Sequence, residues 1–151
     1  MDPRSDYDAQ TGTLPGLTAS DSAPLRPEPP PWLAETRSEL NSPGRYLAFE
    51  QDGRRVVIPL TREWTRIGRS LAADIRFDDA TVSRRHALLA SEPNGVRVLD
   101  DRSLNGIHVN GRRVEWSPLV DGDVLVVGRH VLYFLDTVSS STQALPKALA
   151  E

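Results

Sequence analysis

The sequence predicts an all-β domain, an antiparallel sandwich or barrel, over residues 44–136. Short apolar or alternating runs recur there roughly every 8–12 residues, as they do in sandwiches and barrels. No long amphipathic helix lies among them. Asn-Gly and Asp-Gly dipeptides separate many of the runs, and these pairs tolerate the positive φ angles of tight hairpin turns. A span of about 93 residues is adequate for one core, burying roughly 60–68% of its unfolded surface.

The expected strands follow one another along this domain. They are RYLAFE (45–50), RRVVIPL (54–60), WTRIG (64–68), HALLA (86–90), VRVLD (96–100), IHVN (107–110), RRVEW (112–116), DVLVV (123–127) and HVLYFL (130–135). The turn dipeptides are at 52–53, 94–95, 105–106, 110–111 and 121–122. Together they predict a single domain between two tails.

The N-terminal tail, residues 1–43, holds eight of the twelve prolines, and its apolar residues show no period. Such a segment cannot bury enough surface to offset its chain entropy, so we expect disorder. One exception is WLAETRSEL (32–40), where we expect a short helix of two turns. We expect Trp32 and Leu33 to dock on the core, because an isolated helix this short is marginal in water. Residues 137–151 form a second expected tail.

Composition excludes several classes of site. The chain has no cysteine, which excludes disulfides and thiolate metal ligands. Its three histidines have no paired H-x-x-x-H spacing, so we expect no metal, and no motif points to a cofactor. No stretch approaches the ~20 apolar residues of a membrane span. The polar start MDPRSDYDAQ differs from a signal peptide, so the expected location is the cytoplasm.

Charge is distributed unevenly along the chain. Residues 1–43 carry seven acidic and three basic side chains, whereas residues 44–136 carry thirteen acidic and fourteen basic ones. A nucleic-acid-binding domain has a strongly basic face, so a nearly neutral core argues against nucleic acid as a partner. The sequence therefore pairs an acidic tail with an arginine-containing core.

The stretch VSRRHALL, residues 82–89, allows two interpretations. Ser83 and His86 suggest a hydrolase, but no G-x-S-x-G elbow or third catalytic member accompanies them, so we expect no enzyme activity. The second interpretation is an anion site, because a phosphate needs arginines, hydroxyls and backbone N–H groups from adjacent loops. Side chains of these kinds lie in the expected loops at Arg69, Ser83, Arg84, Ser103 and Asn105. Each alone is an ordinary surface or turn residue.

The order and spacing of these residues resemble the forkhead-associated (FHA) domain. The resemblance lies in Gly68-Arg69, Ser83-x-x-His86, Asn105-Gly106 and Val109-Asn110-Gly111, within DIRFDDATVSRRHA and DDRSLNGIHVNG. It covers residues 44–136 and implies a bacterial single-FHA protein. The implied fold is a sandwich of two twisted antiparallel sheets with about eleven strands. The loops at one end of that fold bind phosphothreonine.

The resemblance also implies a role for each matching residue. Arg69 would grip the phosphate, Ser83 would donate its hydroxyl, and Arg84 would add a phosphate or peptide contact. Asn105 would hydrogen-bond the peptide backbone, with Ser103 holding the loop. Leu104 and Ile107 each stand where the family often has Thr. A leucine side chain cannot make the hydrogen bond that a threonine hydroxyl could make at position 104. The residues that shape loops would be Gly68, His86, Gly106, Asn110 and Gly111.

The expected function is a phosphothreonine-dependent adaptor in Ser/Thr protein kinase signalling. Its partner would be a phosphothreonine protein, such as a kinase or its substrate. An alternative is a regulator that binds metabolic enzymes through the same face until its own tail is phosphorylated. Tail threonines, each with its residue three positions later, are Thr11 with Leu14, Thr18 with Asp21, and Thr142 with Leu145. A third option is a phosphate-independent structural interaction module.

Overall fold

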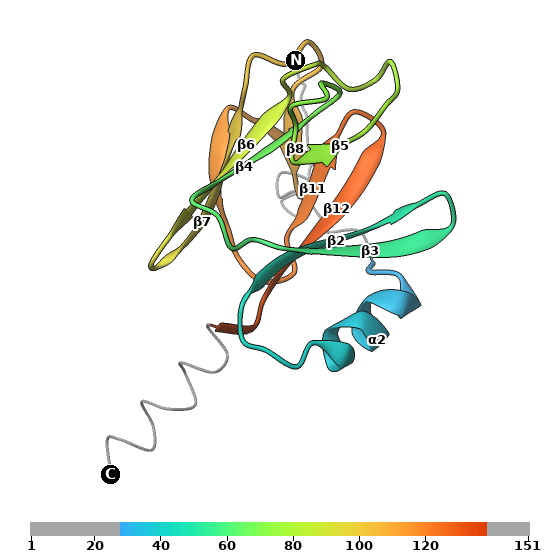
Figure 1. Ribbon diagram of the computed structural model, residues 1–151, viewed down its shortest axis with the longest axis vertical. Coiled ribbons are helices and arrows are strands. Elements are labelled where there is room, and N and C mark those ends of the chain that lie inside the picture. Colours follow the sequence, from blue (N-terminus) through green and yellow to red (C-terminus); the bar gives the residue numbers. More distant parts are fainter. Residues whose placement is uncertain (1–27, 139–151) are drawn as a thin grey trace, which may run out of the picture.

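The computed structural model describes residues 28–138 of the chain. The expected tails fall mainly outside this range, at residues 1–27 and 139–151, and so do Thr11, Thr18 and Thr142. Within it, one helix precedes eleven strands (Figure 1). These are α2 (Pro31–Glu39), β2 (Arg45–Gln51), β3 (Arg54–Pro59), β4 (Trp64–Gly68), β5 (Ile75–Arg76), β6 (Ala87–Glu92), β7 (Gly95–Asp100), β8 (Ile107–Val109), β9 (Arg112–Val114), β10 (Trp116–Leu119), β11 (Val124–Val127) and β12 (His130–Asp136).

The strands form two sheets, in the orders β10-β7-β6-β4-β5 and β3-β2-β12-β11-β8-β9. All pairs are antiparallel except β4–β5, which are parallel with Ile67 opposite Ile75. The predicted all-β sandwich is therefore confirmed, with this one difference. The parallel pair arises because loop 69–74 returns along β4, where Asp74 N–H donates to Arg66 O at 2.9 Å, before β5 starts. The expected strand RRVEW is divided at Glu115 into β9 and β10.

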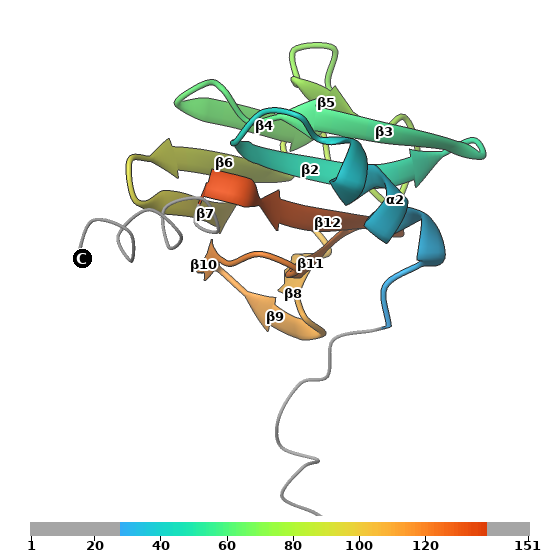
Figure 2. The same ribbon diagram turned by 90° about the horizontal axis from the view of Figure 1, so that it is seen from below.

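The core lies between the two sheets, whose strands partly overlap in the view of Figure 2. Alternate residues of each strand point into it, and fully buried side chains include Leu47, Ile67, Leu89, Leu125 and Phe134. Burying a side chain of this size contributes about 1.5–3 kcal/mol. This rigid interior holds the strand ends, and hence the loops that join them, in place.

Helix α2 packs on the outer face of the six-stranded sheet. Pro31 is at its first turn, where a missing N–H costs nothing. Trp32 and Leu33 are buried against Ala48 and Leu135, and the Trp32 ring meets Tyr133 edge-on with centroids 5.9 Å apart. The packing of these two apolar residues stabilises a helix that is too short to persist alone.

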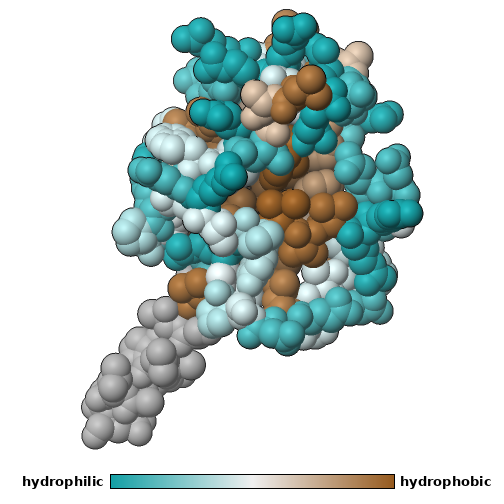
Figure 3. Space-filling model, viewed as in Figure 1, coloured by the Kyte–Doolittle hydropathy of each residue, from teal (hydrophilic) through white to brown (hydrophobic). Residues whose placement is uncertain are grey.

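Three loops meet at the upper end of the molecule in Figure 1, beyond the ends of β4, β6 and β7. They are loops 69–74, 77–86 and 101–106, called the site loops below. From this side the hydrophobic surface gathers lower down, over β2, β3 and β12, whereas the upper end is mostly hydrophilic (Figure 3). The polar residues singled out by the sequence lie largely at that end.

Candidate functional site

The site loops are held together by backbone contact between loop 77–86 and residues 68–70, where β4 continues into loop 69–74. Arg69 N–H donates to Ser83 O at 2.9 Å, and Ser70 N–H donates to Arg84 O at 3.2 Å. The approach is so close that a Cβ on Gly68 would lie 2.1 Å from the Arg84 carbonyl oxygen. Only glycine fits there, which explains why Gly precedes Arg69.

Arg69 is half-buried and lies across loop 77–86. Its Nε–H donates to Val82 O at 3.0 Å, which fixes the plane of the guanidinium. Among the described residues neither terminal nitrogen has a hydrogen-bond partner, so their N–H groups can bind a ligand. A fork of this kind binds a phosphate through two parallel hydrogen bonds.

Ser83 connects loop 77–86 to loop 101–106. Its Oγ accepts a hydrogen bond from Leu104 N–H at 2.9 Å, so the hydroxyl hydrogen can still donate to an anion. The Leu104 side chain is 84% exposed, and only its backbone takes part. Ser103 holds the same loop, because its Oγ accepts from Gly106 N–H and its own N–H donates to Asp100, both at 2.8 Å. The hydroxyl of Ser83 thus sits at the junction of two loops.

His86 is fully buried, and its hydrogen bonds exclude a role as base for Ser83. Nδ1 accepts from the backbone N–H of Ser83 at 3.0 Å, while Nε2 lies 2.8 Å from Gly106 O. A backbone N–H only donates and a carbonyl only accepts, so the ring is neutral with its hydrogen on Nε2. Nδ1 therefore braces loop 77–86 internally, and Nε2 ties that loop to Gly106. A Ser–His nucleophile would need the ring nitrogen on the serine hydroxyl.

Asn105 lies at the exposed tip of loop 101–106, and its Nδ2 donates to Thr81 O at 3.3 Å. Gly106 follows with a φ of 83°. This bond leaves the Asn105 carbonyl oxygen and one amide N–H for a peptide backbone. Farther back, Asn110 (φ 52°) and Gly111 (φ 85°) make the β8–β9 turn. Asn110 also binds Asp123 at 3.0 Å and accepts from Val124 N–H at 2.9 Å, so it holds strands rather than ligand.

One group of interacting side chains, between loop 77–86 and the start of β12, was not predicted from the sequence. Asp79 accepts hydrogen bonds from the hydroxyl and backbone N–H of Thr81 and from His130, and Arg129 lies 3.4 Å away. The Thr81 hydroxyl is the main cause of a pKa of Asp79 well below its usual range, with His130 adding to it. The available signal was local: Asp-x-Thr favours a turn in which the Asp side chain binds the backbone two residues on.

The charges at this end favour an anion. Arg69 and Arg84 have no carboxylate partner within residues 28–138, whereas Arg85 forms a paired contact with Asp101 at 3.0 and 3.1 Å. The hydrogen bond and charge of Asp101 raise the pKa of Arg85. Among the described residues no group of His, Asp or Glu is arranged to hold a metal ion. The site therefore offers the guanidinium groups of Arg69 and Arg84, the Ser83 hydroxyl and the Asn105 amide.

Comparison with known proteins connects this geometry to a family. A model of the FHA domain matches residues 65–128. The chain is 34% identical over 130 residues to the glycogen accumulation regulator GarA of Mycobacterium tuberculosis, covering 86% of this chain and 70% of the relative. It is 30% identical over 130 residues to the oxoglutarate dehydrogenase inhibitor of Corynebacterium glutamicum, covering 80% of that protein. A 45% identical match to the M. tuberculosis ABC transporter protein Rv1747 covers 47% of this chain and only 8% of the transporter.

Solved structures are similar in fold. One is M. tuberculosis EmbR in complex with a low-affinity phosphopeptide, with a TM-score of 0.58 and 31% identity, over 70% of this chain and 28% of EmbR. Another is the FhaA FHA domain complexed with the intracellular domain of Rv3910, with a TM-score of 0.55 and 30% identity, over 60% of this chain and 99% of that one. Both have the same sandwich as this chain.

Proposed function

The chain belongs to the FHA domain family, and on that premise we propose that it is a phosphothreonine-dependent protein-binding adaptor in Ser/Thr protein kinase signalling. Its partner is a protein carrying a phosphothreonine, such as a kinase or a kinase substrate. In this proposal the protein is located in the cytoplasm and acts only by binding its partners, without catalysing a reaction. None of the described helices is long and apolar enough to cross a membrane.

One observation carries this proposal: the unpaired guanidinium of Arg69 lies across the loop that presents the Ser83 hydroxyl. Within residues 28–138 no carboxylate pairs with Arg69, so its guanidinium can form charge-assisted hydrogen bonds with a phosphate. The Asn105 amide, tied to Thr81 on the neighbouring loop, supports a peptide backbone beside the phosphate. These groups together favour a phosphorylated peptide as the ligand over free phosphate.

An array of peptides tests this proposal, each synthesised with phosphothreonine, with phosphoserine and with unmodified threonine. We expect the full chain to bind a subset of the phosphothreonine forms and to bind their unmodified versions at least tenfold more weakly. Equal binding of modified and unmodified peptides would favour the phosphate-independent structural module. Equal binding of the two phosphorylated forms would remove threonine specificity from the proposal.

A second candidate function is regulation by the chain's own phosphorylated tail. Pro30 and Trp32, at the start of α2, line one hollow together with Arg129 and His130. Arg129 N–H in turn donates to the Thr81 hydroxyl, and Thr81 O accepts from Asn105. These contacts link the start of α2, through Arg129, to Thr81 and Asn105 in the site loops. Two of the three relatives above are named as a regulator and as an enzyme inhibitor.

Thr18 lies close enough in sequence for this role, because it is twelve residues from Pro30 and a flexible coil of that length would span roughly 20 Å. Phosphorylation of Thr11 or Thr18 would then place a phosphate at Arg69 of the same chain and block partners. The test compares phosphopeptide affinity before and after treatment with a Ser/Thr kinase. We expect kinase treatment to lower the phosphopeptide affinity of the original chain but not that of the Thr11→Ala, Thr18→Ala double variant. A drop of the same size in that variant would contradict the role of these threonines.

A further inference from the structure

The outer face of the five-stranded sheet differs from its counterpart in having no helix on it within residues 28–138. Helix α2 covers part of the other sheet. Strand register places Arg66 beside Leu88 and Trp64 beside Ala90, so these side chains share one face. Trp64 remains 49% exposed there. An aromatic side chain this open is typical of an interaction surface.

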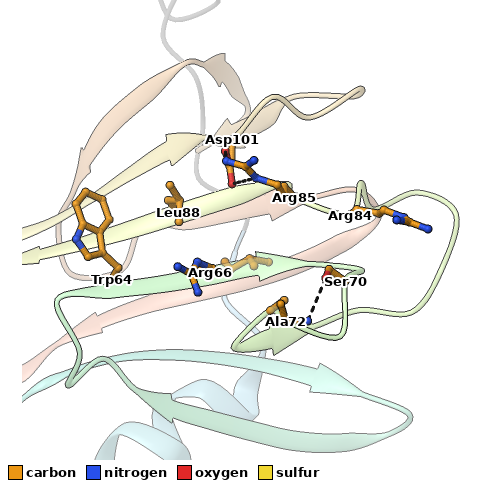
Figure 4. A pocket seen from close by; sticks show the side chains of 10 residues that line it. Trp64, Arg66, Ser70, Ala72, Arg84, Arg85, Leu88 and Asp101 are labelled. Carbon is orange, nitrogen blue, oxygen red and sulfur yellow. Dashed lines mark hydrogen bonds and ion pairs between the residues drawn. The ribbon is translucent and has the colours of Figure 1, made fainter.

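Part of this face is hollowed into a groove of about 590 Å³. Leu88 lies between its ends, Trp64 closes one end, and Arg84 lies at the other, toward the site loops (Figure 4). Loop 69–74 forms a wall with Ser70, Ala72 and Ala73. The groove therefore has an apolar interior, an aromatic end and a polar rim, as small peptide-binding clefts do.

The groove has a surplus of positive charge. Arg66, Arg84 and Arg85 line it with one carboxylate, Asp101, which is 11% exposed and already paired with Arg85. The guanidinium groups of Arg66 and Arg84 have no acidic partner in the part of the chain that the structure describes. An occupant with acidic side chains would neutralise them, which favours such segments over neutral or basic ones.

The groove is continuous with the proposed phosphothreonine site. Arg84 and Ser70 line it, and each is the direct neighbour of a residue proposed to bind phosphate, Ser83 and Arg69. The hydrogen bonds that join loop 69–74 to loop 77–86 lie between the two sites. From Arg69 to Trp64 the strand rises about 17 Å, the length of an extended peptide of about five or six residues.

We propose that this groove binds the segment of the partner chain that flanks the phosphothreonine, and that the segment is acidic with one large apolar side chain. The acidic residues pair with Arg66 and Arg84, and the apolar side chain packs on Leu88 against Trp64. This rests on the proposed function, since the phosphothreonine anchors the segment. Binding both parts of one chain raises affinity through effective concentration.

The test uses the full chain and phosphothreonine peptides of two lengths. The short form is the best-binding peptide of the array, and the long forms add about six residues, rich in Glu with one Leu, on either side. We expect one long form to bind about tenfold tighter, equivalent to about 1.4 kcal/mol. A version with Gln in place of Glu should lose most of that gain, as should high salt.

Two variants in the groove are matched with two on the same face outside it. Trp64→Ala and Arg66→Gln should reduce the gain from the extension to less than threefold while short-peptide affinity stays unchanged. Trp116→Ala and Arg97→Gln should keep the whole gain, because Trp116 is 57% exposed and neither residue lines the groove. Each substituted residue is at the surface, so the variants should fold, and their melting temperatures verify it.

Each remaining outcome overturns a defined statement. Failure of the short peptide itself contradicts the proposed function and this inference together. Short-peptide binding without a gain from either extension, or a gain that the groove variants retain, overturns the inference alone. Removal of residues 1–27 that tightens the long but not the short peptide would instead assign the groove to this chain's acidic tail. Self-association of the chain that Trp64→Ala abolishes would assign it to a second copy.

Discussion

Gly68→Ala should both destabilise the domain and damage the proposed phosphate site. The added Cβ would lie 2.1 Å from Arg84 O, 2.9 Å from its carbonyl carbon and 3.3 Å from Ser83 O. These are backbone atoms, so no side chain can rotate away, and β4 and loop 77–86 must separate. Overpacking of this kind costs about 1–3 kcal/mol. Separation also weakens the hydrogen bonds of Arg69 and Ser70 to that loop, at about 0.5–1.5 kcal/mol each.

The expected loss is therefore about 2–6 kcal/mol in the free energy of unfolding. Urea unfolding followed by tryptophan fluorescence measures it, and phosphopeptide affinity should fall as well because Arg69 and Ser83 move apart. Gly95→Ala is the matched control, since a Cβ there meets nothing within 4 Å and the residue is at the start of β7. A Gly68→Ala variant that is as stable as Gly95→Ala would refute the close packing of β4 against loop 77–86.

Three further predictions concern the loops. Asp79→Asn should lower the free energy of unfolding at neutral pH. Urea unfolding at several pH values should show that the difference between the variant and the original chain shrinks as the pH falls below about 4. A difference that does not change with pH would contradict the charged contacts of Asp79. The sign follows because a pKa lowered by folding stabilises the native state above the ordinary value of 3.8, and this is lost as protons bind. His86→Ala should cost about 3–5 kcal/mol, since it leaves a cavity and unpaired groups at Ser83 and Gly106; calorimetry showing a loss below 1 kcal/mol would contradict it. Asn105→Ala should weaken phosphopeptide binding by about 0.5–1.5 kcal/mol in a titration, less than loss of a charged contact; no loss would remove Asn105 from the site.

The sandwich could be predicted because its determinants are local. Strand periodicity repeats within each run, and turn dipeptides such as Asp52-Gly53 and Asn110-Gly111 adopt the positive φ angles that their chemistry allows. Asn94-Gly95 also forms a turn between strands, but its Gly φ is not positive, so the same dipeptide does not dictate one turn type. Strand β5, with only two residues, is too short to give any periodic signal.

The site was less accessible from the sequence because it depends on contacts between distant residues. Arg69 and Ser83 could be named from their types and order, but the bonds that set their geometry join Val82, Leu104 and backbone carbonyls. The contact of His130 with Asp79 spans fifty-one positions. Neither spacing nor propensity encodes such pairs, since the packing of the two sheets brings them together.

The most direct test of the central claim is a titration of the full chain with its best phosphothreonine peptide, run beside Arg69→Ala, Arg69→Lys and Arg54→Ala. Arg54 is an exposed arginine on the β2–β3 hairpin and serves as the control for lost charge. Because a charged hydrogen bond is lost, the affinity of Arg69→Ala for the peptide should be roughly 10- to 150-fold lower. Arg69→Lys should recover only part of this affinity, because lysine lacks the planar fork of arginine. Arg54→Ala should bind like the unmodified chain. Equal affinity of Arg69→Ala and the unmodified chain would contradict a phosphothreonine site at Arg69.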